Sequence, residues 1–518
     1  MSDQTITFLV LAAVVVVFVL DRLPVAVVAV GTSLSLWATG VLDLNQALAG
    51  FGDPAVLFIA SLFVVSESLD ATGVTAWAGQ MLIERVGESR RRLLVLMMLL
   101  VAVLTALISV NGAVAALLPV MVVTAARLRR PTSQLLMPLA FAAHAGSLLA
   151  LTGSPVNVIA SEYADDAGAG SFGYLSFALA GIPLVAGTIA VVLLFGARLL
   201  PTRSARSLSK DFSDHARTLV EQYGLVDGEA TLTRRSGLAE VVIPPRSELI
   251  GDTAFPGMVT ESGDLVVVAV QRHERELAGE TQLAAGDTLL LGGSWGALGR
   301  LDDPGVLVVD DPELVRRQAV PFGPGARRAV VTLGAMVLLL ATGAVPPAVA
   351  GLLAAGALVV SGVLTIEAAY RGIAWTTVVL VAGMIPLSTA MTQTGAAGRL
   401  ADALVRIVGD AGPYALLLGL FVLTAVLGQL ISNMATALIV FPVALSAARD
   451  LDVSARPVLM CVTVSAAAAL LTPVATPANL MVMEPAGYRF GDYWKLGLPL
   501  LVLYGLVAVL LVPVFWRF

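Results

Sequence analysis

Charged side chains are scarce in this sequence. Asp, Glu, Lys and Arg make up 13% of its 518 residues, whereas soluble proteins contain about 25%. Hydrophobic residues reach 58%, and the mean hydropathy is +0.89. Many apolar stretches reach or approach the roughly 20 residues that an α-helix needs to cross a bilayer. The composition therefore excludes a soluble protein and predicts an integral membrane protein with several spans.

Cysteine is almost absent, because Cys461 is the single one. One thiol cannot form an intrachain disulfide, so a disulfide framework is excluded. Basic patches are missing as well: residues 201–326 carry 12 Lys and Arg against 19 Asp and Glu, a net charge of −7. The whole chain has a formal charge of −6, so its acidity lies in this segment. We therefore expect no nucleic-acid partner.

Helix breakers and polar residues interrupt an apolar run that extends from Leu135 to Ile159. The interruption reads Leu-Thr-Gly-Ser-Pro-Val-Asn at residues 151–157. Gly and Pro break the helix, and side-chain oxygens at membrane depth are costly unless they find partners. A second interruption reads Thr-Pro-Val-Ala-Thr-Pro-Ala-Asn at residues 472–479. Two matching interruptions in the two halves of a chain are typical of a secondary transporter's binding site.

Two further apolar segments have a polar point at their centre. Residues 93–126 are flanked by arginines at both ends and contain Ser109, Asn111 and Gly112 in the middle. Basic residues favour the cytoplasmic side, so both ends of the segment should lie there. Each arm is short for a full span. We therefore predict a re-entrant helical hairpin at about 93–126 and a second at about 416–448, around Ser432-Asn433.

The two halves of the chain repeat with a constant difference in residue number, here called the repeat offset. Pro24 and Pro346 differ in number by 322, and so do Gly40 and Gly362, Gly73 and Gly395, Asn111 and Asn433, and Asn157 and Asn479. Each half has five predicted crossings and one hairpin, and an odd number of crossings gives the halves opposite orientations. We predict an all-α polytopic membrane protein made of two inverted repeats, each with five spanning helices and one re-entrant hairpin.

The predicted domains follow from this repeat. The first membrane repeat covers residues 1–200, with its broken helix at 135–162, and the second covers 327–518, with its broken helix at 457–482. A soluble insert occupies residues 201–326. Arginines lie on both sides of the insert, which places its ends in the cytoplasm. We expect a multi-pass protein of the plasma (inner) membrane.

The insert changes to short β-branched runs between turn signals, which predicts a small α+β module. It reads Gly-Leu-Ala-Glu-Val-Val-Ile-Pro-Pro-Arg-Ser-Glu-Leu-Ile-Gly-Asp-Thr at 237–253 and Ala-Gly-Asp-Thr-Leu-Leu-Leu-Gly-Gly at 285–293. These motifs resemble the TrkA-C domain, the C-terminal half of regulators of potassium conductance, over about 213–310. The resemblance implies a dimerising regulatory domain, with a nucleotide as a candidate ligand. A structural spacer is the alternative.

The membrane part resembles the divalent anion:Na⁺ symporter family of the ion transporter superfamily. The Thr-Pro-type breaks of that family match Ser154-Pro155 and Thr476-Pro477. Its Ser-Asn-Thr motif at each hairpin tip is replaced here by Ser109-Val110-Asn111-Gly112 and by Ser432-Asn433-Met434. The resemblance implies Na⁺-coupled symport of a small divalent anion, such as sulfate or a dicarboxylate, by a homodimer in the lipid bilayer.

Hydroxyl and carboxamide oxygens at the tips and breaks suit a hard cation such as Na⁺, and the helix N-termini after the breaks suit an anion. The predicted ion-binding residues are Ser109, Asn111, Thr152, Ser154, Asn157, Ser432, Asn433, Thr472, Thr476 and Asn479. The predicted substrate-binding residues are Asn111, Gly112, Ser154, Pro155, Asn433, Thr436, Thr476 and Pro477. We expect no catalytic residue and no cofactor other than the coupling Na⁺.

Other functions stay open at this point. A Na⁺/H⁺ or metalloid antiporter would need a buried titrating acid, which the central apolar segments lack. A channel-like, K⁺-linked protein would need a filter like Thr-Val-Gly-Tyr-Gly, which does not occur. A membrane receptor would not explain the paired breaks. His144 has Ala466 as its counterpart in the repeat, and it either relays protons or bonds a neighbouring carbonyl.

Overall fold

The computed structural model describes residues 2–20, 22–86, 89–128, 130–203, 236–260, 263–272, 275–277, 279–298, 306–308, 322–408 and 412–518. Contacts divide the chain into two units. The membrane unit comprises Met1–Leu69, Ala78–Ser207 and Arg328–Phe518, and the insert unit comprises Asp70–Trp77 and Leu208–Arg327. The start of the predicted TrkA-C-like module, at 213–235, lies outside the described residues.

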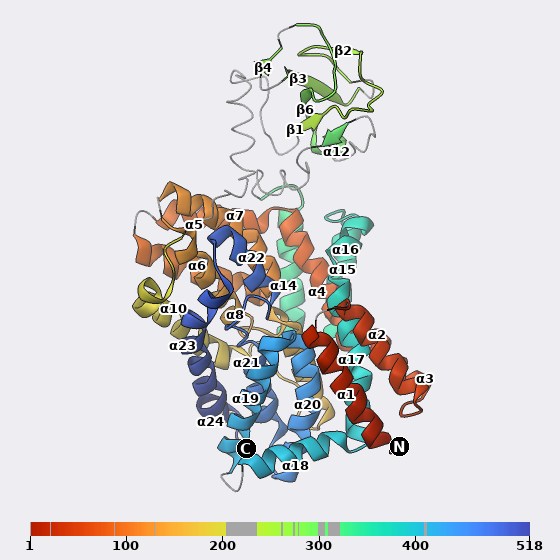
Figure 1. Ribbon diagram of the computed structural model, residues 1–518, viewed down its shortest axis with the longest axis vertical. Helices are drawn as coiled ribbons and strands as arrows, with labels where there is room; N and C mark the ends of the chain where they lie inside the picture. Colours follow the sequence, from red (N-terminus) through yellow and green to blue (C-terminus); the bar gives the residue numbers. More distant parts are fainter. Residues whose placement is uncertain are drawn as a thin grey trace. The chain divides into compact units, whose positions relative to one another are not determined.

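Helices dominate the chain before the insert (Figure 1). In chain order they are α1 (Asp3–Leu20), α2 (Val25–Ala38), α3 (Leu44–Leu48), η1 (Ala49–Gly52), α4 (Pro54–Ala71), α5 (Val74–Val86), α6 (Arg90–Leu107), α7 (Val110–Arg127), η2 (Thr132–Gln134), α8 (Leu136–Gly146), η3 (Leu151–Gly153), α9 (Pro155–Asp166) and α10 (Ala178–Leu199).

The helices after the insert follow a similar order. They are α14 (Ala326–Thr342), α15 (Pro347–Val360), α16 (Ile366–Gly372), α17 (Trp375–Gln393), α18 (Ala396–Val408), α19 (Pro413–Leu430), α20 (Asn433–Asp450), α21 (Ala455–Ala466), α22 (Pro477–Ala486), η4 (Phe490–Asp492), α23 (Tyr493–Leu506), the π-helical η5 (Val507–Leu511) and α24 (Val512–Phe515). α9 and α22 both begin at a proline, and the repeat offset relates these two prolines.

Six helical segments among the described residues are long and apolar enough to cross a membrane. They are Asp3–Leu20, Leu44–Ala71, Ala178–Leu199, Trp375–Gln393, Pro413–Leu430 and Phe490–Phe515. Ten spanning helices were predicted, and several of the corresponding helices, such as α2 and α15, are shorter than a full span. The chain is therefore a mostly helical, multi-pass membrane protein.

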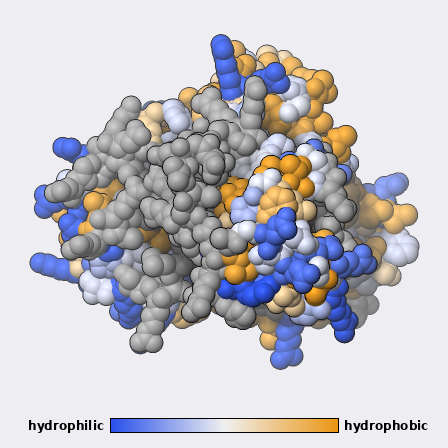
Figure 2. Space-filling model, turned by 90° about the horizontal axis from the view of Figure 1, so that it is seen from above, coloured by the Kyte–Doolittle hydropathy of each residue, from blue (hydrophilic) through white to orange (hydrophobic). Residues whose placement is uncertain are grey.

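Hydrophobic side chains are exposed on the outside of the helices. Leu194, Val360 and Ile407 are 70%, 89% and 84% exposed, and hydrophobic surface is visible at the edge of the face shown in Figure 2. An apolar surface of this kind costs free energy in water but suits the hydrocarbon core of a bilayer. The outside of these helices thus agrees with a membrane environment.

Each predicted hairpin consists of two helices joined by a very short connection. α6 and α7 are joined at Ile108-Ser109, and α19 and α20 at Ile431-Ser432. Each of these four helices has 18 residues. Both helices of each pair contact one another, and α19, α20 and α21 also pack together (Figure 1).

Each predicted broken helix also forms as two helices with an irregular segment between them. The first consists of α8, the short η3 and α9, and the second of α21 and α22. Ser154 and Thr476 adopt extended backbone immediately before Pro155 and Pro477. Proline favours such a backbone in the residue before it and suits the first position of a helix, which explains where both second helices begin.

The insert unit is built on antiparallel sheets. β1 (Ser236–Val242), β3 (Leu265–Arg272), β4 (Arg275–Glu276), β6 (Thr288–Ser294) and β7 (Leu307–Val308) form one sheet in the order β4-β3-β6-β1-β7. β2 (Thr253–Ala254) pairs with β5 (Thr281–Gln282). The only helix wholly within the described part of 236–308 is α12 (Trp295–Leu298), so strands dominate where an α+β module was expected.

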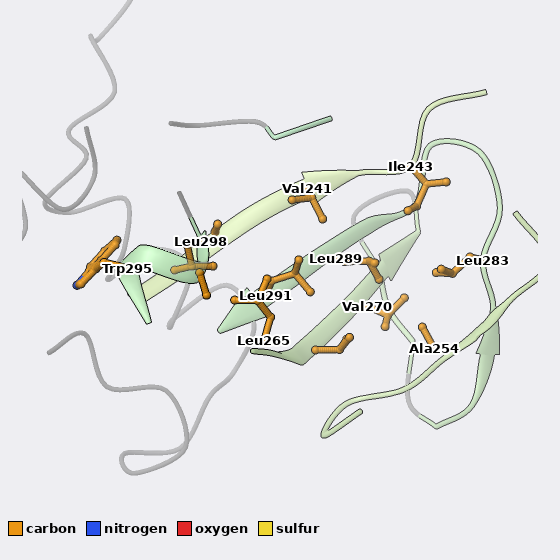
Figure 3. Packing of buried hydrophobic residues seen from close by; sticks show 13 residues of the cluster. Val241, Ile243, Ala254, Leu265, Val270, Leu283, Leu289, Leu291, Trp295 and Leu298 are labelled. Atoms are coloured by element: carbon orange, nitrogen blue, oxygen red, sulfur yellow. The ribbon is translucent and has the colours of Figure 1, made fainter. Parts of the chain in front are cut away.

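Apolar residues and one ion pair hold this sheet together. Val241, Ile243 and Leu289 point into a buried hydrophobic cluster, together with side chains from α12 (Figure 3). Nε of Arg272 donates to Oδ1 of the buried Asp287 at 2.6 Å. This hydrogen bond raises the pKa of the Arg272 guanidinium above its ordinary value. The pair connects β3 with the turn before β6.

Candidate substrate and ion site

A cavity of about 310 Å³ lies inside the membrane unit. Its walls come from both hairpin tips, both helix breaks and the helices α2, α4, α8, α17 and α21. Nine of the predicted site residues line it: Ser109, Asn111, Ser154, Pro155, Asn157, Ser432, Asn433, Thr476 and Pro477. Pockets for small molecules measure about 300–1,000 Å³. The cavity is therefore large enough for a small ligand, and it joins segments from both halves of the chain.

Four helices begin at this cavity, and each has a hydroxyl group at its first turn. Ser109 Oγ accepts from the Gly112 N–H of α7 at 3.2 Å, and Ser154 Oγ accepts from the Val156 N–H of α9 at 3.2 Å. In the second half of the chain, Ser432 and Thr476 likewise accept a backbone N–H from the first turn of α20 and α22. Helix N-termini carry a partial positive charge, so four of them at one cavity favour an anion.

The two tips differ in register by one position. The repeat offset pairs Asn111 with Asn433. The capping hydroxyls belong to Ser109 and Ser432, whose residue numbers differ by one more than the repeat offset. Asn433 is consequently the first residue of α20, whereas Asn111 is the second residue of α7. The first tip has one additional residue between its cap and its asparagine, which accounts for its departure from the Ser-Asn order.

Two asparagines fix the shape of the breaks through identical hydrogen bonds. Asn157 Nδ2 donates to the carbonyls of Ser147 and Ala150, at 2.7 and 2.9 Å. Asn479 Nδ2 donates to the carbonyls 10 and 7 residues before it, at 2.8 and 3.1 Å. Both side chains are fully buried. The carboxamide NH₂ groups thus satisfy carbonyls that the interrupted helices leave without a partner.

The carboxamide oxygens of the two asparagines differ in their surroundings. Asn157 Oδ1 is buried and has no hydrogen-bond partner in the described structure. Asn479 Oδ1 lies 3.3 Å from His144 Nε2, which also lies 3.1 Å from Thr476 Oγ1. His144 is 2% exposed and lines the cavity. His144 therefore bonds side-chain oxygens of the second break, whereas a bond to a neighbouring carbonyl was the expected alternative to a proton relay.

Five predicted site residues are not among the residues that line the cavity. Thr152 Oγ1 donates to the Ala106 carbonyl at 2.7 Å and bonds the Tyr174 hydroxyl, so this side chain has structural partners. The Gly112 N–H donates to Ser109 Oγ, and Thr472 Oγ1 donates to the Gln429 carbonyl at 3.5 Å. Thr436 Oγ1 is buried without a partner in the described structure. Asn479, the fifth, bonds two lining residues, His144 through its Oδ1 and Thr476 through its backbone N–H.

Gln429 is a site residue that sequence reasoning missed. Its Oε1 accepts from the Leu471 N–H at 2.9 Å, and its Nε2 donates to the Ala468 carbonyl at 3.2 Å. One side chain thus satisfies a donor and an acceptor of the second break. A single glutamine in the otherwise apolar run of α19 was the available signal, because such a residue is costly unless it is bonded.

The cavity carries no charged side chain among its described lining residues, since none is Asp, Glu, Lys or Arg. Nor do the described residues of the chain contain a group of three or more His, Cys, Asp or Glu side chains that could hold a metal ion. A ligand would therefore meet hydroxyl groups, carboxamides, the His144 ring and backbone groups. This donor set suits small ions better than it suits covalent chemistry.

Comparisons with known proteins agree with a transporter. The chain is 30% identical to "Uncharacterized transporter YfbS" of Escherichia coli (strain K12), over 98% of each chain. It is 26% identical to "Probable sodium/sulfate cotransporter 3" of Chlamydomonas reinhardtii, over 53% of this chain and 32% of that protein. The crystal structure of the Alcanivorax borkumensis YdaH transporter matches 91% of this chain and 87% of its own, with a TM-score of 0.50 and 13% identity. The last match concerns the fold alone.

The sequence profile of the citrate transporter family, CitMHS, matches residues 15–441 and 337–518, which together include both hairpins and both breaks. This result supports the predicted superfamily, and the narrower divalent anion:Na⁺ symporter family stays a prediction. The chain belongs to the citrate transporter family of the ion transporter superfamily.

Proposed function

We propose that this protein is a secondary active transporter that takes up a small, divalent anion together with Na⁺. The observation that carries the proposal is the cavity at which four helices begin, each with a capping hydroxyl group at Ser109, Ser154, Ser432 or Thr476. Each helix N-terminus stabilises a nearby anion by about 0.3–1 kcal/mol, and by up to about 2 kcal/mol when partly buried. Four of them form an anion site without any lysine or arginine.

The lack of charged side chains in the described lining supports the proposed coupling to Na⁺. A divalent anion that leaves water for a largely apolar cavity loses hydration worth many kcal/mol, and helix dipoles replace only part of it. A cation that binds beside the anion supplies the missing charge. Carboxamide and hydroxyl oxygens are available at the tips and breaks, and such hard ligands suit Na⁺. Sodium/sulfate cotransporters among the relatives support this reading.

Alternating access would use the repeated organisation of the chain. The two halves contain elements in the same order, and the breaks of both halves share one cavity. In the proposed mechanism the halves are inverted repeats, and the cavity opens to one side of the membrane at a time while the bound ions stay at the breaks. We also propose that the protein is a homodimer in the plasma membrane with the insert in the cytoplasm.

The insert unit is proposed to be a regulatory domain of the TrkA-C type. Its described strands coincide with the motifs that resemble that domain: Gly237–Val242 lie in β1 and Thr288–Gly293 in β6. Such a domain would bias the transporter toward one conformation when an intracellular ligand binds. A nucleotide is the ligand class we propose first.

An uptake panel tests the proposed function. Purified protein in proteoliposomes would be given radiolabelled sulfate, succinate, citrate and phosphate, with either Na⁺ or choline as the external cation. We expect uptake of at least one of the divalent or larger anions, and we expect choline to reduce it by at least about tenfold. Uptake that is equal in Na⁺ and choline would contradict Na⁺ coupling, and uptake of none of the four would contradict the proposed substrate class.

A further inference from the structure

The two helix breaks have the same hydrogen-bonded frame, but only the second has a histidine beside its carboxamide oxygen. Asn157 and Asn479 hold equivalent carbonyls in the same way. His144 on α8 faces the second break. Its counterpart in the repeat is Ala466 on α21, and α21 packs against α9, the helix that carries Asn157. The repeat is therefore asymmetric at the point where an ion would bind.

The proton of His144 can be assigned from its partners. Asn479 Nδ2 donates to two carbonyls, which fixes the orientation of the carboxamide and turns Oδ1 toward His144. An amide oxygen is only an acceptor, so the His144 Nε2 atom at 3.3 Å must carry a proton. Thr476 Oγ1, at 3.1 Å from the same nitrogen, is the second oxygen beside this N–H group. At the second break, the imidazole N–H stands where a cation would contact both oxygens.

The first break has the same acceptor without such a donor. Asn157 Oδ1 is buried, unpartnered in the described structure, and fixed in orientation because its Nδ2 is bonded to two carbonyls. Ala466 carries only a methyl group, and both Asn157 and Ala466 line the cavity, whereas Asn479 does not. A buried carboxamide oxygen without a partner costs about 1–3 kcal/mol. A bound ion at this point would remove that cost.

We propose that the coupling cation binds at the first break, on Asn157 Oδ1, and that the His144 N–H group takes the place of a cation at the second break. The inference rests on the proposed Na⁺ coupling and deepens it by assigning an unequal pair of sites. Asn433 Oδ1 is the other buried carboxamide oxygen at the cavity that has no partner in the described structure. No hydrogen bond in the described structure fixes the Asn433 carboxamide, so it can turn its NH₂ group toward the anion.

The test is the number of Na⁺ ions bound by the purified full-length protein, measured with ²²Na⁺ by equilibrium binding. Wild type should bind one ion per chain. Ala466→His should lose binding, because the new imidazole can donate to Asn157 Oδ1. His144→Ala should raise the stoichiometry about twofold, because it frees the Asn479 oxygen. The double variant His144→Ala/Ala466→His should return it to one ion, now at the second break. His144→Gln, whose side-chain NH₂ group still donates, should match wild type.

Several results would overturn the inference. Two ions bound by wild type, with no change in His144→Ala, would show that His144 does not replace a cation. Folding of Ala466→His would be checked by gel filtration and thermal unfolding. Full Na⁺ binding by the folded variant would show that the cation does not bind at Asn157. If Ala466→His does not fold, the comparison of His144→Ala with His144→Gln decides in the same way. Absence of Na⁺ binding from every folded protein, together with Na⁺-independent uptake, would instead refute the proposed Na⁺ symport itself.

Discussion

At the scale of single residues, the two asparagines of the breaks have a structural task beside any role in ion binding. Asn479 gives both hydrogens of its NH₂ group to backbone carbonyls and is fully buried. Thr476 Oγ1 accepts the Asn479 N–H group and lies 3.1 Å from His144 Nε2. The carboxamide thus holds the break together, whereas the threonine hydroxyl lines the cavity.

We predict different outcomes for alanine at these two positions. Asn479→Ala leaves two buried carbonyls unpaired, which costs about 1–3 kcal/mol each. Thr476→Ala removes a helix cap worth about 1 kcal/mol. Thermal unfolding in detergent should therefore show a clearly larger loss for Asn479→Ala, while Thr476→Ala, which removes a capping hydroxyl from the cavity wall, should mainly weaken anion uptake. Equal midpoints for the two variants would contradict the structural task of Asn479.

Sequence reasoning located the residues that form the two breaks but not the hydrogen bonds that each end of their carboxamides makes. Asn157 and Asn479 were predicted as ion ligands because their oxygens suit Na⁺. Which end of a carboxamide faces the ion depends on the carbonyls around it, and only the folded break shows that Nδ2 is already occupied. The role of His144 stayed open for the same reason, because its partners are 332 and 335 residues away in the chain.

At the scale of elements, glycines let a neighbouring helix touch each break. A Cβ atom on Gly181 of α10 would lie 2.2 Å from the Leu148 carbonyl oxygen, and one on Gly497 of α23 would lie 2.1 Å from that of Leu470. Leu148 and Leu470 are themselves related by the repeat offset. Both breaks are thus supported from behind by a glycine on a later helix, and no other residue can replace it without moving the backbone.

Alanine at these glycines should therefore displace the breaks. We predict that Gly181→Ala and Gly497→Ala each lower stability by about 1–3 kcal/mol through overpacking and reduce anion uptake. Gly356→Ala in α15 is the matched control, because nothing lies within 4 Å of its added Cβ. Unfolding midpoints and initial uptake rates would be measured on all three. Wild-type values for both Gly181→Ala and Gly497→Ala would show that the close approach is not needed.

Gln429 provides a second test at this scale. Gln429→Leu removes the partners of the Leu471 N–H group and the Ala468 carbonyl, which should cost about 1–3 kcal/mol for each group left unpaired. We expect a lower unfolding midpoint and weaker anion binding, seen as a higher KM for uptake. Gln429→Glu keeps the acceptor for Leu471 and should fall between wild type and Gln429→Leu. A Gln429→Leu protein with a normal KM and a normal unfolding midpoint would show that the second break does not need the Gln429 hydrogen bonds.

At the scale of the whole molecule, the insert unit can be removed at defined points. The membrane unit continues to Ser207 and resumes at Arg328. Arg203 still belongs to it: Nη1 of Arg203 lies 2.7 Å from Asp492 Oδ2, and its backbone N–H donates to Ser133 Oγ. A deletion that joins Arg203 to Ala326 through a flexible linker thus keeps these contacts, whereas one that joins Leu200 to Ala326 loses them.

We predict that the protein joined at Arg203 keeps Na⁺-dependent uptake, because every residue of the cavity belongs to the membrane unit. Its uptake should no longer respond to intracellular nucleotides, if these act through the insert unit. The protein joined at Leu200 is the control for the Arg203–Asp492 pair and should be less stable. Unchanged nucleotide responses after deletion would favour the spacer, and loss of anion binding would make the insert structural.

Much of the whole-molecule organisation could be predicted, because the repeat offset is a direct property of the sequence. It identified the matching tips and breaks, and the structure brings them to one cavity. Helix lengths and the tip register were harder. Several apolar helices are shorter than a full span, and the shift of one position between Ser109 and Ser432 depends on which hydroxyl caps the helix.

The most direct measurement is whether a Na⁺ gradient drives accumulation of the anion through this cavity. Proteoliposomes with an inward Na⁺ gradient would be compared with proteoliposomes that have equal Na⁺ on both sides, using wild type and the double variant Ser154→Ala/Thr476→Ala. We predict that wild type concentrates the anion above its external level only with the gradient. The variant should lose this accumulation while it still folds. Accumulation without a Na⁺ gradient, or unchanged accumulation in the variant, would contradict Na⁺-coupled transport at the two breaks.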